Sequence, residues 1–193
     1  VSYSAWEIIF VDDGSYDNSY NVIQNIVGSD KRVKAIQLLK NFGKAAALSE
    51  GFKLVKGKYV VTIDADLQDD PKEIPNLVSK LETGYDLVSG WKIDRQDPWT
   101  KTLPSKIFNF ITRILTGVRI HDFNCGLKIY RKSVVRALDI YGGLHRYIPA
   151  LASQKQFRIT EIPVKHYPRK YGMSKYGGTR LLHGFFDLIT ILF

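Results

Sequence analysis

The first half of the chain alternates short apolar runs with stretches of helical spacing. The runs typical of strands are residues 6–13, 33–39, 58–66 and 85–91. Helical patterns fill the intervals that end near Val27, at Gly57 and at Gly84. Strands that alternate with helices are joined by crossover connections, so this half predicts an α/β fold. In such a fold, ligands bind at the carboxyl ends of the strands.

The second half has a different pattern. Residues 102–116 predict a helix with one apolar stripe, formed by Leu103, Ile107, Phe110, Ile111 and Ile114. Segments 124–131 and 157–167 are predicted as strands, and 169–178 as a basic loop punctuated by glycine. The apolar run 181–193 is shorter than the ~20 residues that cross a bilayer. It is compatible with the start of a spanning helix, with an interfacial helix or with a core helix.

Length and composition favour one domain in a reducing compartment. A chain of 193 residues with 45% hydrophobic content is long enough for one substantial core. We therefore predict a single domain over residues 1–193, with a ligand-binding half at 1–98 and a second half at 99–193. The single cysteine, Cys125, excludes an intramolecular disulfide and a multi-cysteine metal site.

Charge is distributed unevenly between these halves. The net charge is +9, but residues 1–98 carry 15 acidic and 12 basic side chains, whereas residues 99–193 carry 4 acidic and 16 basic ones. An acidic half joined to a basic half indicates a metal or polar-ligand site on one side and an anionic partner on the other. Nucleic acid and anionic lipid both fit this charge pattern.

Two acidic clusters follow predicted strands. Asp64 and Asp66 leave the strand 58–66 with Gln68 two residues on, and their oxygens suit Mg²⁺ or Mn²⁺ while leaving positions for diphosphate oxygens. Asp12 and Asp13 end the strand 6–13 and could accept hydrogen bonds from a nucleobase or a ribose. Each cluster has a simpler alternative as a turn or helix cap. If both are functional, we expect them to face one crevice.

Five motifs occur in a fixed order along nearly the whole chain: VDDGS (11–15), DADLQDDP (64–71), VSGWK (88–92), FNCGLKIYRK (123–132) and RKYGMSKYG (169–177). Together they resemble the polyprenyl-phosphate glycosyltransferases of family 2, of the dolichyl-phosphate mannose synthase and bactoprenol glucosyltransferase type. The resemblance implies a GT-A fold, in which a Rossmann-like nucleotide-binding sheet is fused to an acceptor-binding half.

The resemblance also implies roles for the acidic residues. Asp12 and Asp13 would contact the nucleoside, Asp64 and Asp66 would lie at the diphosphate and the metal, and Gln68 would help to ligate the metal. Family members usually begin with a strand of the type V-x-V-V-I-P-x-Y-N-E and often continue into transmembrane helices. We therefore expect that the first strand is missing here and that the chain is a fragment.

The implied reaction is transfer of a sugar, with inversion, from a UDP- or GDP-sugar to a membrane polyprenyl phosphate. A phosphate monoester has a second pKa near ~6 and is already deprotonated at neutral pH, so the protein needs cations more than a base. The candidates for the acceptor phosphate are Arg113, Arg119, Arg131, Ser105 and Asn109. For Ser105 and Asn109, a simple pair on the helix surface is an equal alternative.

The expected catalytic set is Asp66, Asp122, Arg131 and Arg169. Arg131 and Arg169 are expected to be catalytic, and the loop with Arg169 and Lys175 is expected to close over the donor diphosphate. Asp122 could orient the acceptor, or act as a base if the acceptor is a hydroxyl. A salt bridge to a neighbouring arginine is the alternative for Asp122.

The expected partners are the donor, the lipid acceptor and a membrane surface, with a homo-oligomer also compatible. Lys101, Lys106, Arg113 and Arg119 flank the apolar stripe, as in an interfacial helix, although the stripe could instead pack on the sheet. The expected location is the cytoplasmic face of the bacterial inner membrane, with any transmembrane segments outside these residues. Two rivals are a GT-A enzyme that acts on a saccharide or protein hydroxyl, and a non-enzymatic nucleotide- or nucleic-acid-binding module. Since the second leaves the acids without a role, we expect no nucleic-acid partner.

Overall fold

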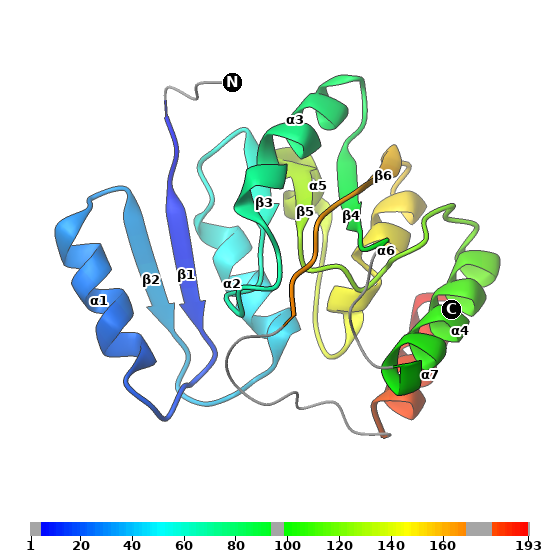
Figure 1. Ribbon diagram of the computed structural model, residues 1–193, viewed down its shortest axis with the longest axis horizontal. Coiled ribbons are helices and arrows are strands. Elements are labelled where there is room, and N and C mark those ends of the chain that lie inside the picture. Colours follow the sequence, from blue (N-terminus) through cyan, green and yellow to red (C-terminus); the bar gives the residue numbers. More distant parts are fainter. Residues whose placement is uncertain (1–4, 94–98, 169–178, 193) are drawn as a thin grey trace.

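The computed structural model describes residues 5–93, 99–168 and 179–192 as a mixed α/β structure (Figure 1). The elements, in chain order, are β1 (Ile8–Asp12), α1 (Ser19–Ser29), β2 (Val33–Gln37), α2 (Lys44–Leu54), β3 (Tyr59–Thr62), η1 (Pro71–Glu73), α3 (Ile74–Glu82), β4 (Leu87–Trp91), α4 (Trp99–Thr116), β5 (Lys128–Arg131), α5 (Lys132–Ala137), η2 (Leu144–Arg146), α6 (Ile148–Gln154), β6 (Ile159–Pro163) and α7 (Thr179–Leu192).

The strands form two sheets. β1 pairs in parallel with β2, and the second sheet has the order β3-β5-β4-β6. β5 is antiparallel to both of its neighbours, whereas β4 and β6 are parallel. The other strands therefore run in one direction, and their carboxyl ends lie at the lower edge in Figure 1.

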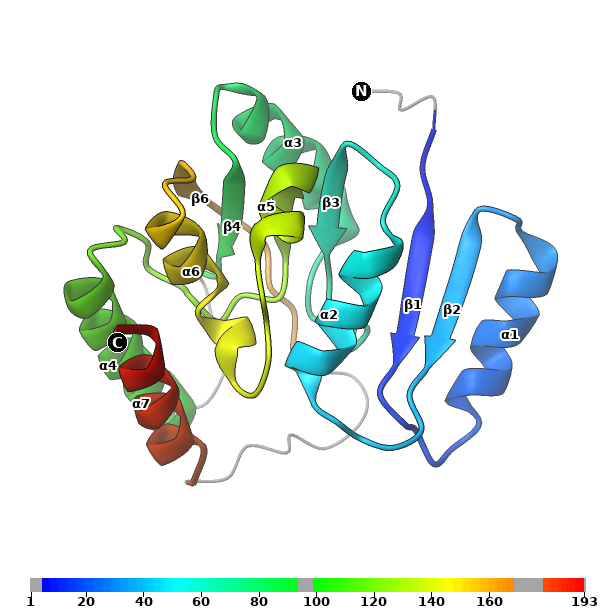
Figure 2. The same cartoon turned by 180° about the vertical axis from the view of Figure 1, so that it is seen from behind.

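Helix α2 joins the two sheets. Its residue Gly51 lies against the Val11 side chain of β1, while Leu48 and Phe52 pack on the core that contains Val60 of β3. Figure 2 shows α2 lying across the interval between β1 and β3. No strand in the described part of the chain pairs with the second edge of β1 or of β3.

The hydrophobic core has two parts, one on each face of the larger sheet. Leu87 and Tyr130 belong to the part covered by α2, α5, η2, α6 and α7. Their chain neighbours Val88 and Ile129 belong to the part covered by α3. This alternation follows from the period of two along a strand. The first part extends from Ala45 to Ile191; the single domain over 1–193 stays a prediction.

The elements near the acidic motif differ from the sequence-based expectation. β3 ends at Thr62 instead of continuing to Asp66, and β5 begins at Lys128 instead of Asn124. Residues 63–68 instead turn out of the sheet, with Leu67 in the left-handed region at φ +61°. The helices α5 and α6 were not predicted. After β3 and before β5, residues that we expected in strands therefore lie in loops, where their side chains can form a binding site.

The apolar stripe of α4 does not pack on the sheet. Its side chains Ile107, Phe110 and Ile114 are between 52% and 61% exposed. α4 contacts α7, which buries Leu188 and Ile191 in the core but exposes Phe186 and Ile189. Within the described ranges, no helix is both long and apolar enough to span a membrane.

Replacing Gly90 by alanine tests the packing of β4. A Cβ atom at Gly90 would lie 2.8 Å from Cγ2 of Val164 and 2.9 Å from Sγ of Cys125. We expect Gly90→Ala to lower the free energy of unfolding by about 1–3 kcal/mol, measured by chemical denaturation. The control is Gly28→Ala in α1, where the new Cβ meets nothing within 4 Å and helix propensity favours alanine by about 0.5–1 kcal/mol. Equal stability of Gly90→Ala and the wild type would contradict this packing.

Candidate active site

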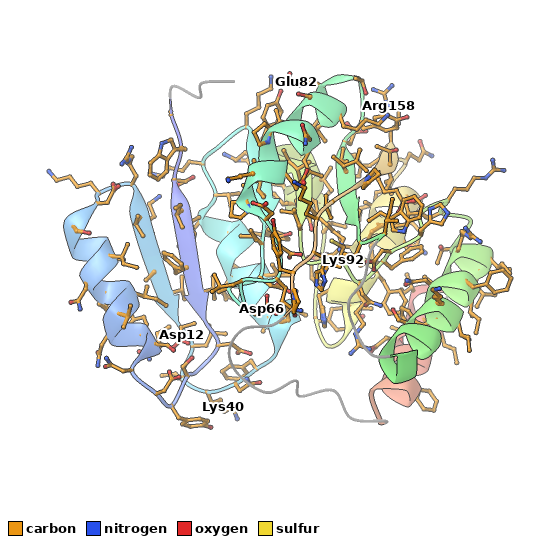
Figure 3. All side chains as sticks on the ribbon, in the orientation of Figure 1. Asp12, Lys40, Asp66, Glu82, Lys92 and Arg158 are labelled. Carbon is orange, nitrogen blue, oxygen red and sulfur yellow. The ribbon has the colours of Figure 1, made fainter. Side chains whose placement is uncertain are left out.

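The acidic strand ends and several lysines meet at the carboxyl edge of the sheets. Figure 3 places Asp12 and Asp66 at this edge, opposite Glu82 and Arg158. Because β5 is antiparallel to its neighbours, its first residue lies at this same edge. This residue, Lys128, pairs with Thr62 of β3 and with Ser89 of β4. The segment that leads into β5 is thereby placed beside Asp64.

Asp64 is paired with a lysine from the start of α2. The Nζ atom of Lys44 lies 2.5 Å from Oδ1 and 2.8 Å from Oδ2 of Asp64, and both side chains are partly exposed. Burial alone would raise the pKa of the Asp64 carboxyl, but the ammonium groups of Lys44, Lys92 and Lys128 outweigh it and hold this pKa below its ordinary value. Asp64 is therefore ionised at neutral pH and surrounded by positive charge.

Asp12 and Asp13 have partners of their own. The buried Asp12 carboxylate accepts hydrogen bonds from the backbone and hydroxyl of Ser15, which is the turn-and-cap arrangement. Asp13 accepts hydrogen bonds from the backbone N–H groups of Phe42, at 2.8 Å, and Gly43, at 2.9 Å. Since Lys44 follows directly, one loop ties the end of β1 to the exit of β3. The loop 42–44 thus contacts one residue of each acidic cluster, Asp13 and Asp64.

The turn 64–68 holds the candidate metal ligands. Asp66 accepts a hydrogen bond from the backbone N–H of Gln68 at 3.2 Å. Gln68 exchanges hydrogen bonds with Tyr167: its carbonyl accepts from the Tyr167 N–H at 2.8 Å, and its amide nitrogen donates to the Tyr167 carbonyl at 3.3 Å. Tyr167 also donates its hydroxyl to Asp70. These bonds tie the turn to the segment that follows β6.

The donor set of this turn suits a hard divalent ion. Two carboxylates and one amide oxygen, from Asp64, Asp66 and Gln68, are the ligand types that Mg²⁺ and Mn²⁺ prefer, provided that phosphate or water oxygens complete the shell. Over the described ranges, no group of three or more His, Cys, Asp and Glu side chains is placed to hold a metal by itself. The oxygen donors of residues 64–68 are nevertheless of the type that suits such an ion.

Asp122 sits in a segment that Glu161 of β6 fixes in place. The Glu161 carboxylate accepts the backbone N–H of His121 at 2.7 Å and that of Asp122 at 3.4 Å, and it contacts the His121 ring. That ring stacks on Trp91 at the end of β4, with centroids 4.1 Å apart. The buried Asp122 carboxylate accepts the N–H of Asn124 at 3.0 Å. No described arginine pairs with Asp122.

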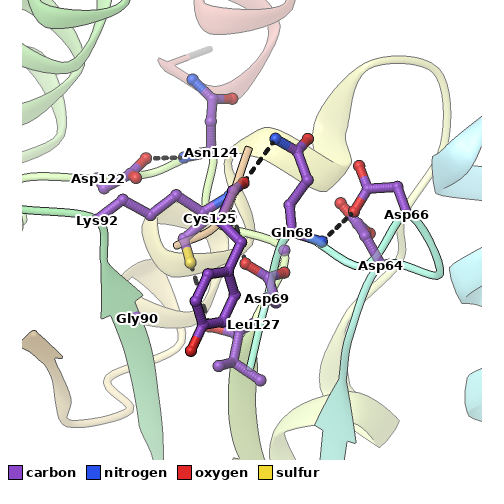
Figure 4. Close-up of polar contacts among 12 residues, drawn as sticks. Asp64, Asp66, Gln68, Asp69, Gly90, Lys92, Asp122, Asn124, Cys125 and Leu127 are labelled. Atoms are coloured by element: carbon purple, nitrogen blue, oxygen red, sulfur yellow. Dashed lines mark hydrogen bonds and ion pairs between the residues drawn. The ribbon is translucent and has the colours of Figure 1, made fainter. Parts of the chain in front are cut away.

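Sequence reasoning missed two buried residues, Lys92 and Asp69, shown with their neighbours in Figure 4. Nζ of Lys92 lies 3.4 Å from Oδ1 of Asp69, and their side chains are only 13% and 1% exposed. Burial alone would lower the pKa of Lys92, but the nearby carboxylates of Asp69, Asp122 and Asp64 raise it. Lys92 is therefore a charged ammonium group held among acids. In the sequence, Lys92 was marked only by its position at the end of the VSGWK motif.

Lys128 is a second buried lysine that the sequence did not single out. Its ammonium group donates to the carbonyls of Phe123, at 3.1 Å, and Cys125, which fixes the curve of the segment before β5. Burial lowers the pKa of Lys128. Burial also raises the pKa of the Cys125 thiol to about 12, so this thiol is protonated at neutral pH and unsuited to nucleophilic catalysis.

A pocket of about 190 Å³ adjoins Asp64 on the α2 side. Its charged and polar lining comprises Lys44, Asp64, Asn124, Lys128, His145 and Arg146. The last two come from η2, and Arg146 is one of the basic residues of the second half that the sequence offers as candidates for a phosphate. The pocket is therefore formed by α2, β3, the segment before β5, and η2. More of its charged side chains are basic than acidic.

The expectation for Arg131 needs correction. Because β5 runs antiparallel, Arg131 pairs with Tyr59 at the start of β3, at the far end of the sheet from Asp64. Its guanidinium donates to the carbonyls of Tyr85 and Leu81 and lies 3.5 Å from the Asp86 carboxylate. Arg131 is therefore held away from the site and cannot serve as a catalytic or acceptor-binding residue there.

The remaining expected residues are placed as follows. Asn109 is buried on α4, Ser105 and Arg113 are partly buried on the same helix, and Arg119 is exposed just after it. The guanidinium of Arg113 lies over the Phe110 ring. Arg169 and Lys175 fall outside the described residues, so their expected roles stay predictions.

Removing the Glu161 carboxylate should loosen the segment that carries Asp122. We expect Glu161→Ala to lower the hydrogen-exchange protection of the His121 amide by roughly one to two orders of magnitude, because a hydrogen bond to a charged acceptor contributes about 1.5–3 kcal/mol. The control is Glu82→Ala, which removes an exposed glutamate that accepts a hydrogen bond from the Tyr59 hydroxyl. Unchanged protection of residues 119–126 in Glu161→Ala would show that this clamp does not hold the segment.

Solved structures show the same fold. The Mycobacterium tuberculosis glucosyl-3-phosphoglycerate synthase in complex with Mn²⁺, uridine diphosphate and phosphoglyceric acid aligns with a TM-score of 0.71 at 18% identity, over 96% of this chain and 67% of that one. The same enzyme with Mg²⁺ and uridine diphosphate aligns with a TM-score of 0.68, over 93% and 67%. This likeness confirms the GT-A fold.

Curated relatives are closer in sequence. Dodecaprenyl-phosphate galacturonate synthase of Rhizobium johnstonii is 39% identical, over 97% of this chain and 57% of that protein. Undecaprenyl-phosphate 4-deoxy-4-formamido-L-arabinose transferase of Edwardsiella ictaluri is 40% identical, over 97% and 58%. The chain thus spans less than two thirds of the length of these relatives.

The family itself is matched directly. The model of glycosyl transferase family 2 matches residues 2–139, which is more than half of the chain. Together with relatives about 40% identical along nearly the whole sequence, this match identifies the chain as a member of glycosyl transferase family 2.

Proposed function

We propose that this chain is the catalytic part of an inverting glycosyltransferase that moves a sugar from a nucleotide-sugar to a membrane polyprenyl phosphate. The observation that carries the proposal is the meeting of Asp64, Asp66 and Gln68 with Lys44, Lys92 and Lys128 at one edge of the sheets. Acidic oxygens suit a metal, and fixed cations suit phosphate groups. The printed names of the two relatives, both polyprenyl-phosphate sugar enzymes, support this acceptor class.

On the donor side, the turn 64–68 would hold Mg²⁺ or Mn²⁺ through Asp66 and Gln68, with Asp64 beside them. When bound, this metal would stabilise the charge that develops on the departing nucleoside diphosphate. Asp13 and the loop at Gly43 lie next along the same edge, and a nucleoside would lie against them. The uridine diphosphate seen in the M. tuberculosis structures supports a nucleotide donor of this kind.

On the acceptor side, Lys92 replaces Arg131 in our assignment. Its ammonium group is charged, buried and surrounded by Asp69, Asp122 and Asp64. A deprotonated phosphate that approaches Asp66 would need such a cation beside it, both for binding and to offset the nearby carboxylates. Asp122 would then orient the acceptor, and no general base is needed because the attacking phosphate oxygen carries no proton.

A lipid acceptor needs access from a membrane surface. Ile107, Phe110 and Ile114 of α4 and Phe186 of α7 are exposed, and the same region of the chain carries Lys106 and Arg113 on α4 and Arg119 just after it. A helix pair with apolar side chains flanked by cations is typical of an interfacial element on anionic lipid. We place this surface against the cytoplasmic face of the bacterial inner membrane.

The acceptor is tested by transfer assays with Asp66→Asn. We expect labelled sugar from a UDP- or GDP-sugar to pass to a short polyprenyl phosphate in the presence of Mn²⁺, and Asp66→Asn to lower the rate at least ~100-fold, because a ligand to the charge-stabilising metal is weakened. Asp17→Asn, at an exposed turn, is the control. Transfer to a saccharide or to a polyprenol without phosphate at the same rate would favour the hydroxyl-acceptor rival and contradict the proposal.

Vesicle binding tests the membrane surface. We expect the protein to sediment with vesicles that contain phosphatidylglycerol, and the double variant Phe110→Ser/Ile114→Ser to bind at least ~100-fold more weakly, since each buried apolar side chain contributes about 1.5–3 kcal/mol and the variant removes two. Val22→Ser removes an equally exposed apolar side chain from α1 and should have no effect. Equal loss in both variants, or none in the double variant, would refute this docking surface.

A further inference from the structure

The ammonium group of Lys44 bridges both oxygens of the Asp64 carboxylate. Its Nζ atom is within hydrogen-bond distance of both Asp64 oxygens, at 2.5 Å and 2.8 Å. A carboxylate that an ammonium group bridges in this way presents reduced negative charge to a second cation. Asp64 can therefore offer its full negative charge to a metal ion only after Lys44 has moved.

Of the three lysines near Asp64, Lys44 has the side chain that is least restrained. Lys128 is buried and bonded to two backbone carbonyls, and Lys92 is buried against Asp69. The Lys44 side chain is 38% exposed, and it extends from the first residue of α2 on a flexible stem. Its backbone is nevertheless fixed, because the preceding Gly43 donates its N–H to Asp13.

The charge around Asp64 disfavours a metal ion that arrives alone. The ammonium group of Lys44 lies against both Asp64 oxygens and Lys128 lines the same pocket, and these positive charges repel a divalent cation that arrives without an anion. A nucleoside diphosphate reverses this balance, because its oxygens attract both the metal and a released ammonium group. Lys44 lines the pocket beside Asp64, so its ammonium group can turn from the carboxylate to a diphosphate in that space.

We propose that Lys44 is an exchangeable counter-ion of the donor site, which holds Asp64 in the empty enzyme and moves to the diphosphate when the metal and the nucleotide bind. This inference rests on the proposed function and concerns how binding at the same site is regulated. Metal and nucleotide are then coupled: each binds more tightly when the other is present, by the same factor.

The test is Mn²⁺ binding, followed by electron paramagnetic resonance, with and without the nucleoside diphosphate that binds, UDP or GDP. We expect Lys44→Met to bind Mn²⁺ alone roughly tenfold more tightly than the wild type, because the competing cation is gone. We expect it to bind the diphosphate in the presence of Mn²⁺ roughly tenfold more weakly, because the ammonium contact is lost; typical couplings are ~5–150-fold.

Two variants serve as controls. Lys53→Met removes an exposed lysine from the other end of α2, where it pairs with Glu50, and should leave both affinities unchanged. Lys44→Arg keeps a cation and should restore the coupling. Thermal melting of all variants separates a loss of binding from a loss of folding.

The outcomes separate this inference from the proposed function. If the wild type binds Mn²⁺ with the diphosphate and Lys44→Met gives the same two affinities, the counter-ion role is refuted and the donor site stands. If the wild type binds no Mn²⁺ with either diphosphate, or if Asp66→Asn binds it equally well, the metal site itself is wrong and both proposals fall. Opposite shifts of the two affinities in Lys44→Met alone are the result that a purely structural salt bridge would not produce.

Discussion

The site depends on the antiparallel insertion of β5 between β3 and β4. In this register, Lys128 lies opposite Thr62 and Ser89, and the Thr62 hydroxyl donates to the Gly126 carbonyl at 2.9 Å. A Cβ atom on Gly126 would lie 2.6 Å from the Asp64 carboxylate, so the approach to β5 passes directly beside the acidic turn. The same register sends Arg131 to the opposite end of the sheet.

Buried charges in this region explain one another. An isolated carboxylate or ammonium group is costly to bury, and each remains charged only with compensating partners. Asp69 contacts Lys92, and Lys128 is bonded to two carbonyls; the Asp64–Lys44 pair beside them is partly exposed. A core designed for stability alone would have apolar side chains at these positions. A cluster of lysines and carboxylates of this kind supports the proposed binding of a charged ligand, and its lysines suit phosphate groups.

Local sequence patterns predicted most of the strands and the acidic strand ends, because periodicity and turn residues are visible along the chain. The direction of β5 was not visible, since it is set by partners about forty and about seventy residues away, and this produced the error at Arg131. Lys44, Lys92 and Lys128 were missed because a lysine in sequence is usually a solvated surface residue. Burial distinguishes Lys92 and Lys128, and the contact with Asp64 distinguishes Lys44. His145 and Arg146 of η2 reach the pocket through tertiary packing alone.

The central claim is that the carboxyl edge of the sheets, with the approach to β5, is the donor site. A crystal structure of the chain with Mn²⁺ and a nucleoside diphosphate tests it most directly. The account predicts a metal bound through Asp66 at a distance of about 2–2.3 Å, with the diphosphate beside Lys44 and the segment before β5. A nucleotide bound elsewhere, or a metal at this edge without Asp66 among its ligands, would contradict it.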